Sequence, residues 1–130
     1  MLVDTPVWSE FFRRHAPDGT IQGGLKVLIE DGEALMLGPV RQEILSGISE
    51  ERKCEQLCKA LGGFPDIMVL KSDYEDAARM YNHCRRHGIQ GSNTDFLICA
   101  VSARLNAPIF TLDKDFEKFA KQLPVSLYSV

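Results

Sequence analysis

Four acidic residues occupy positions where carboxylates can do chemistry together: Asp4, Glu43, Asp95 and Asp113. Asp4 and Asp113 each follow a short apolar segment, and Asp95 opens the apolar helix that precedes the second of these segments. In a parallel α/β sheet, right-handed crossovers bring such strand ends to one edge, where ligands bind. Carboxylates gathered there repel one another unless a cation lies among them. Because no His or Cys accompanies them, the ligand set indicates Mg²⁺ or Mn²⁺ rather than zinc.

A hard divalent ion held by carboxylates is suited to phosphoryl chemistry, because it polarises a phosphate oxygen and lowers the pKa of a bound water. No arrangement of Ser, Cys or His competes as a nucleophile. The glycine pairs Gly23-Gly24 and Gly62-Gly63 lack the GxxxxGK[ST] pattern, so the sequence does not predict a nucleoside triphosphate site of the P-loop kind.

Each of the four acids also has a structural explanation. Asp4 and Asp113 suit the N-cap of the helices that follow them, and Asp95 matches a capping box with Ser92. Glu43 borders an apolar stripe, where a lone acid is usually a solvated flank. These structural roles explain each acid singly, whereas the common place of the acids at one edge of a sheet favours a shared site.

The elements that position these acids follow from the hydrophobic pattern. The sequence predicts strands at Met1–Val3, Ala34–Leu37, Ile67–Leu70, Pro108–Leu112 and Val125–Tyr128. It predicts helices that begin at Pro6 and Gly38, and further helices at Ile21–Glu30, Glu50–Leu61 and Lys114–Lys121. A long helix is expected from a Ser72–Glu75 capping box to a stop at Gly88.

The helix between Ser92 and Asn106 is apolar almost without interruption. A helix of that composition must be buried on most of its circumference. We therefore expect Asp95, in its first turn, to lie inside the fold or at the floor of a cleft.

Length and composition fit one domain over residues 1–130, since 45% of the residues are hydrophobic and 25% charged. The chain has no apolar run of about 18 residues and no basic segment before its first apolar one, so we expect no membrane span and no signal peptide. The four cysteines fall on apolar helix faces and suit the reducing cytoplasm: Cys54, Cys58, Cys84 and Cys99. A net charge of −3 argues against a broad basic surface for nucleic acid.

Zinc is the alternative ion to weigh. Cys54 and Cys58 are four residues apart, as are His83 and His87, so a Cys2His2 site is arithmetically possible. The cysteines are explained as core positions of their helix, and the short spacing of zinc fingers is absent. The sequence therefore favours core cysteines over a zinc site.

Three motifs in order resemble those of PIN-domain ribonucleases of the VapC type, the toxins of toxin–antitoxin pairs. They are LVDTPVW at the N-terminus, PVRQEILSG around Glu43 and TDFLICAVSARLNAPIFTLDKDF toward the C-terminus. The resemblance covers essentially the whole chain. It implies a three-layer α/β/α sandwich with a central, mainly parallel sheet, and Mg²⁺- or Mn²⁺-dependent endonucleolytic cleavage of single-stranded RNA such as tRNA or mRNA.

Residue by residue, the resemblance implies that Asp4, Glu43, Asp95 and Asp113 form a catalytic quartet. Asp4, Asp95 and Asp113 would bind the metal, with Glu43 completing the shell or orienting water. Supporting positions are Thr5, Asn93, Thr111 and Asp115, the last being a second candidate for the fourth acid. Pro6 departs from the pattern, because many relatives carry Ser there.

The resemblance also implies a homodimer and a cognate antitoxin that lies along a groove near Trp8, Phe11 and Phe12, unless these aromatics are simply core. Local positive charge for RNA is expected from Arg13, Arg14, Arg85, Arg86 and Lys114. Two other classes compete. A PIN fold that binds RNA or protein without cleaving is disfavoured by the intact quartet. A phosphoacceptor receiver domain would need paired acids after its first strand and a late-strand Lys, which are absent from the sequence.

Overall fold

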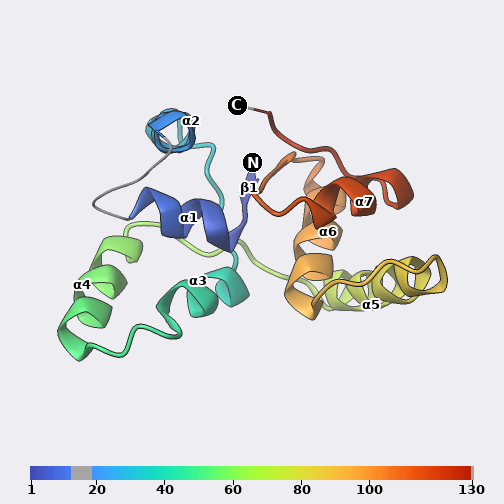
Figure 1. Cartoon of the computed structure of the whole chain (residues 1–130), viewed down its shortest axis with the longest axis horizontal. Helices are drawn as coiled ribbons and strands as arrows, with labels where there is room; N and C mark the ends of the chain where they lie inside the picture. Colours follow the sequence, from blue (N-terminus) through green and yellow to red (C-terminus); the bar gives the residue numbers. More distant parts are fainter. Residues whose placement is uncertain (13–18, 130) are drawn as a thin grey trace.

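The computed structural model describes residues 1–12 and 19–129, which form two short strands and seven helices. In chain order these are β1 (Leu2–Val3), α1 (Thr5–Phe11), α2 (Gly19–Glu30), α3 (Gly38–Leu45), α4 (Glu51–Leu61), α5 (Lys71–Arg86), α6 (Asn93–Leu105), β2 (Ile109–Phe110) and α7 (Asp115–Gln122). Figure 1 shows α1 to α4 on one side of β1 and α5 to α7 on the other. The chain is thus an α/β protein with helices flanking central strands.

The sheet is parallel and has β1 at its centre. β1 pairs with β2 in parallel, with Leu2 opposite Ile109 and Val3 opposite Phe110. Single parallel bridges extend this ladder on both sides: Leu2 with Leu35, Met36 with Asp66, and Ile109 with Leu127. The spatial order across the sheet is therefore the segment at 66, the segment at 35–36, β1, β2 and the segment at 127. Chain order reverses between β1 and β2, which makes their carboxyl ends the expected place for a ligand.

Four of the five predicted strand segments join the sheet in shortened form, whereas the segment expected at 67–70 contains no strand residue. β2 covers two residues rather than Pro108–Leu112, and the segments expected at 34–37 and 125–128 join the sheet through single bridges. The segment expected at 67–70 contributes only a bridge at Asp66 and a hydrogen bond from the Ile67 N–H to the Met36 carbonyl (2.9 Å). It leaves the sheet early because Leu70 already caps the next helix.

The start of α5 differs from the prediction. The helix begins at Lys71, and its first turn is held by Asp73 rather than by a Ser72–Glu75 box. The Asp73 carboxylate accepts the Leu70 N–H (2.8 Å) and the Nε of Arg104 on α6 (2.8 Å). Asp73 is only 1% exposed, so the sequence motif was outcompeted by a buried ion pair that joins α5 to α6.

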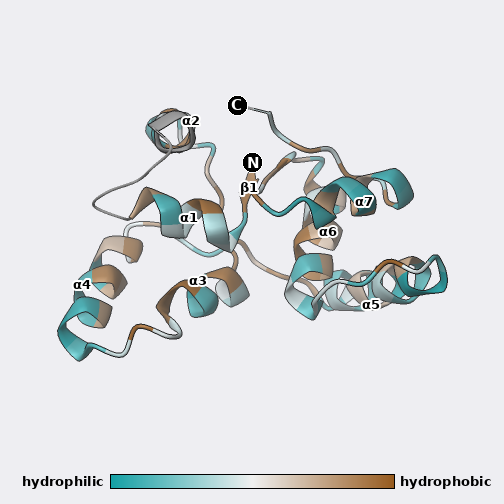
Figure 2. Ribbon diagram, in the orientation of Figure 1, coloured by the Kyte–Doolittle hydropathy of each residue, from teal (hydrophilic) through white to brown (hydrophobic). Residues whose placement is uncertain are grey.

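α6 forms the centre of the core, as its composition predicted. Every residue from Phe96 to Ser102 is buried, and α5 and β2 both pack against the helix. Figure 2 shows hydrophobic residues along α6 and hydrophilic ones on much of α7. Before α6, the backbone at Gly91 passes so close to Phe119 that an added Cβ would lie 2.6 Å from its ring. Only glycine allows this approach, which fixes the entry to the helix that carries Asp95.

The cysteines follow the prediction in part. All four are free, and Cys84 and Cys99 are buried. Cys58 is exposed and Cys54 half-buried, so the expectation that both serve as core residues is wrong for Cys58. On α4 only Leu61 is fully buried, because this helix leaves part of its apolar face uncovered. None of the helices in the described residues has the length and apolar character needed to cross a membrane.

The ion pair between α5 and α6 predicts a large effect on stability. Burial alone would raise the pKa of Asp73, but hydrogen bonds and the charge of Arg104 outweigh it and hold the pKa below 3.8. Arg104→Met leaves a buried carboxylate unpaired, so we expect the free energy of unfolding in urea to fall by about 3 kcal/mol at neutral pH. This loss should disappear as the pH falls below the ordinary pKa of Asp73 and through its lower folded value.

Arg79→Met is the matched control, because Arg79 forms an equally short ion pair with Asp76 (2.8 Å) on the surface. That exposed pair is expected to contribute less than about 1 kcal/mol. Equal losses in the two variants would contradict a special role for the buried pair.

Candidate active site

The candidate site lies at the carboxyl ends of β1 and β2. Asp4 follows β1 directly, and its N–H donates to the Phe110 carbonyl (2.9 Å), so the ladder between the strands continues to this residue. Thr111 is the first residue after β2. Two positions more than a hundred residues apart in sequence are thereby fixed side by side.

Thr111 links two of the predicted acids. Its hydroxyl donates to Oδ2 of Asp4 (2.8 Å), and its oxygen accepts the Asp113 N–H (3.0 Å). The other carboxylate oxygen of Asp4 accepts the Thr5 N–H (2.8 Å). Asp4 is therefore the N-cap that the sequence suggested and is also oriented by a residue of the neighbouring strand.

Thr5 connects the third acid to this pair. Its hydroxyl donates to Oε1 of Glu43 on α3 (2.7 Å). Pro39 in the first turn of α3 suits a helix start at this point, since its missing N–H is not needed there. Glu43 is exposed, so it stands at the solvent side of the site.

Asp95 reaches the site from the start of α6. It forms a reciprocal capping box, in which Asp95 accepts the Ser92 N–H (2.9 Å) and the Ser92 hydroxyl accepts the Asp95 N–H (3.1 Å). The predicted cap is confirmed. Its presence does not remove Asp95 from the acid group, because the charges of Asp113 and Glu43 act on its carboxylate.

The pKa values of the acids report their proximity. Burial, together with the negative charges of Asp95 and Asp113, raises the pKa of Asp4 from 3.8 to about 6, against hydrogen bonds from Thr111 and Thr5. Burial likewise raises the pKa of Asp95, with added repulsion from Asp113 and Glu43. Asp4 and Asp95 thus lie where ionisation of their carboxyl groups is unfavourable, within reach of the charges of the other predicted acids.

Asp113 and Asp115 differ in their surroundings. The charge of Asp113 acts on Asp4 and Asp95, and its Oδ1 accepts the Asp115 N–H (2.9 Å). Asp115 is exposed and lies 3.8 Å from the Nζ of Lys118, one turn along α7. This geometry favours Asp113 as the fourth acid and Asp115 as part of a surface ion pair.

The remaining predicted residues are spread more widely. Asn93 is exposed one turn ahead of the core of α6, and Lys114 is exposed directly after Asp113. Arg85 and Arg86 are exposed in the last turn of α5, where Arg85 donates to the Tyr81 hydroxyl (3.0 Å). The predictions at 13 and 14 lie outside the described residues.

The donor chemistry suits a hard divalent cation. The four side chains offer only oxygen, which is the donor that hard divalent cations prefer. In the described part of the chain, no three His, Cys, Asp or Glu side chains converge closely enough to form a complete metal site, which also applies to the zinc combination. Instead, Glu43 accepts the Thr5 hydroxyl, Asp4 accepts the Thr111 hydroxyl, and the Asp95 carboxylate accepts the Ser92 N–H.

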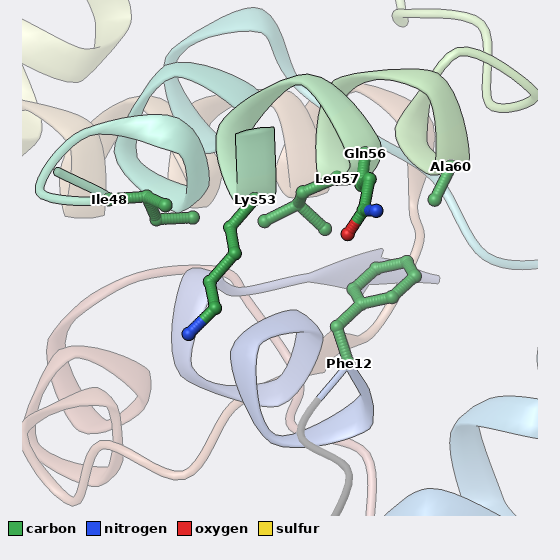
Figure 3. A pocket seen from close by; sticks show the side chains of 6 residues that line it. All are labelled: Phe12, Ile48, Lys53, Gln56, Leu57 and Ala60. Carbon is green, nitrogen blue, oxygen red and sulfur yellow. The ribbon is translucent and has the colours of Figure 1, made fainter. Parts of the chain in front are cut away.

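A groove on the α1–α4 side was only partly foreseen. It has a volume of about 590 Å³ and is lined by Phe12, Ile48, Lys53, Gln56, Leu57 and Ala60. Figure 3 shows the side chains of α4 pointing toward Phe12 at the end of α1. Trp8 is fully buried, so of the expected aromatics it belongs to the core and Phe12 to the groove. The amphipathic pattern around Leu57 was the signal in the sequence, although it was assigned to the core.

The chain is similar to known proteins over most of its length. Residues 1–122 match the family described as PIN domain. Ribonuclease VapC11 of Mycobacterium tuberculosis is 31% identical over 123 residues, which are 93% of this chain and 92% of that protein. A VapC ribonuclease of Mycobacterium bovis shows the same identity and coverage.

Solved structures share the fold at lower identity. FitAcB from Neisseria gonorrhoeae aligns with a TM-score of 0.79 at 19% identity, over 98% of this chain and 96% of that one. VapBC2 from Rickettsia felis, bound to a DNA fragment from its promoter, aligns with a TM-score of 0.72 at 19% identity and the same coverage. At this identity the likeness establishes the fold.

The raised pKa of Asp4 predicts a pH-dependent penalty. Between pH 3.8 and about 6 the folded state binds more protons than the unfolded state, so stability falls as the pH rises through this window. A shift of about two pKa units corresponds to about 3 kcal/mol. In EDTA, Asp4→Asn is therefore expected to be more stable than wild type at a pH of about 8, with the difference vanishing toward a pH of about 4.

Urea unfolding across this pH range measures the effect, and Asp31→Asn, on the exposed turn after α2, removes the same charge as a control. A constant difference between wild type and Asp4→Asn at every pH would show that the carboxylate carries no such penalty.

Proposed function

The chain belongs to the PIN domain family, and we propose that it is an endoribonuclease that cleaves single-stranded RNA with Mg²⁺ or Mn²⁺, as the toxin of a toxin–antitoxin pair. The observation that carries the proposal is the hydrogen-bond chain from Asp113 through Thr111 to Asp4, which brings two acids to the switch point of the sheet. The 31% identity to proteins named as VapC ribonucleases supports the same reading.

In the proposed site, Asp4, Asp95 and Asp113 hold the divalent ion, directly or through water. When bound, the ion supplies positive charge for a phosphate oxygen and makes a bound water more acidic. The Thr111 hydroxyl and the Thr5 N–H fix the orientation of the Asp4 carboxylate. Glu43, held by Thr5 on the solvent side, is placed to orient the attacking water. In-line attack on the phosphodiester would leave 5′-phosphate and 3′-hydroxyl ends.

RNA is expected to bind weakly, because the chain has a net charge of −3. Lys114, next to Asp113, and the arginines of the α5 terminus are the proposed phosphate contacts. The free cysteines suit the cytoplasm, where such a substrate would be found. The alternative, a PIN fold that binds RNA or protein without cleaving, would have no need of acids oriented by the hydroxyls of Thr5 and Thr111.

We propose the groove lined by Phe12 and Leu57 as the seat of a cognate antitoxin. The Arg41 guanidinium donates to the carbonyls of Leu61 and Phe64, which fixes the end of α4 to α3 and keeps the groove in shape. An apolar segment of the partner would cover the open face of α4. The occurrence of FitAcB and VapBC2 among proteins of this fold supports such a partner.

A homodimer is the second proposed assembly. Met68 is 76% exposed and Tyr74 is 56% exposed, and with Leu70 they form an apolar surface at the start of α5. Large exposed apolar patches usually mark an interface. A second copy of the chain is the proposed occupant of this surface.

Cleavage of a mixed single-stranded RNA pool tests the enzyme. Wild type is expected to cleave with Mn²⁺ or Mg²⁺ and to stop on addition of EDTA. Asp95→Asn should lower the cleavage rate by at least about a hundredfold, because a ligand of the ion is lost. Asn keeps an oxygen that can accept the Ser92 N–H, so the variant should fold.

Asp113→Asn is expected to resemble Asp95→Asn, whereas Asp115→Asn, which alters only a surface ion pair, should retain activity within about threefold. Full activity in Asp95→Asn would contradict its assignment as a ligand. A larger loss of activity in Asp115→Asn than in Asp113→Asn would contradict the choice of Asp113 as the fourth acid. Ion binding without cleavage by the wild type would support the non-cleaving alternative.

The groove is tested with the product of a small reading frame beside the gene. Leu57→Glu places a charge in the apolar lining and is expected to weaken the complex at least about tenfold in calorimetry. Lys59→Glu changes charge on the exposed part of α4 and should bind like wild type. Equal weakening by both variants would argue for a charge effect rather than contact in the groove.

A further inference from the structure

A separate pocket adjoins the acid site on the α7 side. It has a volume of about 220 Å³, and its walls include Thr111 and Asp113 of the acid site. Its other walls come from Lys114 and Glu117 at the start of α7 and from Tyr128 and Ser129. A molecule in this pocket would therefore touch two residues of the candidate site.

Tyr128 is held firmly in the wall of this pocket. Its N–H donates to the Ile109 carbonyl (2.7 Å), which continues the parallel pairing beside β2. Its ring lies 4.9 Å from the ring of the buried Phe110, with 55° between the planes. Because the side chain is half-buried, part of its surface packs on the sheet and part lines the pocket. An aromatic surface fixed in this way is suited to stacking of a planar base.

The charges around the pocket separate a place for phosphate from a place for an uncharged group. Lys114 is exposed and forms no ion pair with any residue in the described parts of the chain. Lys118, by contrast, lies beside Asp115 (3.8 Å). Glu117 and Asp113 make the walls negative, so a phosphate is expected at Lys114 on the rim. A neutral, hydrogen-bonding group is expected inside, beside Tyr128.

We propose that this pocket binds the nucleotide adjacent to the scissile phosphate, with its base stacked on Tyr128 and its outer phosphate at Lys114. The inference rests on the RNA substrate of the proposed function and assigns a subsite to it. A base has the planar shape for the Tyr128 ring and polar edges for Glu117 and Ser129. Through this contact, Tyr128 and its neighbours set a preference for the nucleotide at that position.

Binding of a short fluorescein-labelled single-stranded RNA, followed by anisotropy, tests the subsite. Asp95→Asn serves as the parent, so that no cleavage disturbs the measurement. Tyr128→Leu, which keeps an apolar contact with Phe110 but no ring, is expected to weaken binding about tenfold. Tyr128→Phe keeps the ring and should bind within about twofold of the parent. Urea unfolding of both variants shows whether the fold is kept.

Lys114→Met provides a readout that does not depend on packing. It should weaken binding and lower the salt dependence by about one counterion. Lys118→Met removes the same charge farther along α7 and should leave the salt dependence unchanged.

Tyr128→Leu is then made in the active protein, which keeps Asp95. There, Tyr128→Leu should raise KM more than it lowers kcat and shift the preferred nucleotide at the cleavage site.

The outcomes separate the two proposals. If Tyr128→Leu and Lys114→Met bind RNA like the parent, the subsite is overturned, while ion-dependent cleavage by wild type would leave the proposed function intact. If wild type cleaves nothing but RNA binding depends on Tyr128 and Lys114, the proposed function fails and the pocket stands as an RNA-binding site. Absence of any RNA binding overturns the subsite.

Discussion

The rest of the structure depends on one buried carboxylate at the end of the central strand. Asp4 is 5% exposed and is held by the next residue in the chain and by a hydroxyl 107 positions away. The contact with the Thr111 hydroxyl requires that β1 and β2 lie in parallel register with their carboxyl ends together. The strands β1 and β2 are only two residues long each. The register of the sheet is therefore fixed less by hydrogen bonds between strands than by the core on which the sheet lies. That core is α6, whose apolar length explains how so short a sheet can hold a charged group in place.

Gathering acids in this way opposes folding, and other parts of the chain offset it. Like charges and desolvation raise the pKa of Asp4 and Asp95, which is the sign of ionised groups kept where they are unfavourable. The continuous apolar surface of α6 and the Asp73–Arg104 pair act on the same two-helix unit that carries Asp95. Stability is thus concentrated next to the acids, whose arrangement is itself less stable.

Patterns local in sequence predicted much of this architecture. The acid after each apolar segment, the Ser92–Asp95 cap and the burial of α6 follow from spacing alone, and they are present. Features set by contacts between distant segments were missed. Asp73 replaces the expected cap of α5 because Arg104 lies beside it, and Cys58 is exposed because no helix in the described residues covers that face of α4. The pocket around Tyr128 has no signal in the sequence, since its walls come from three separate segments.

The capping box of α6 restricts how Asp95 can act as a ligand. One of its oxygens, Oδ2, already accepts the Ser92 N–H (2.9 Å). A cation that took both oxygens would free a helix-terminal amide, at a cost of about 1 kcal/mol. One that took Oδ1 alone would leave the helix start intact. In the proposed site, Asp95 would therefore hold the ion through one oxygen and keep the start of α6 intact.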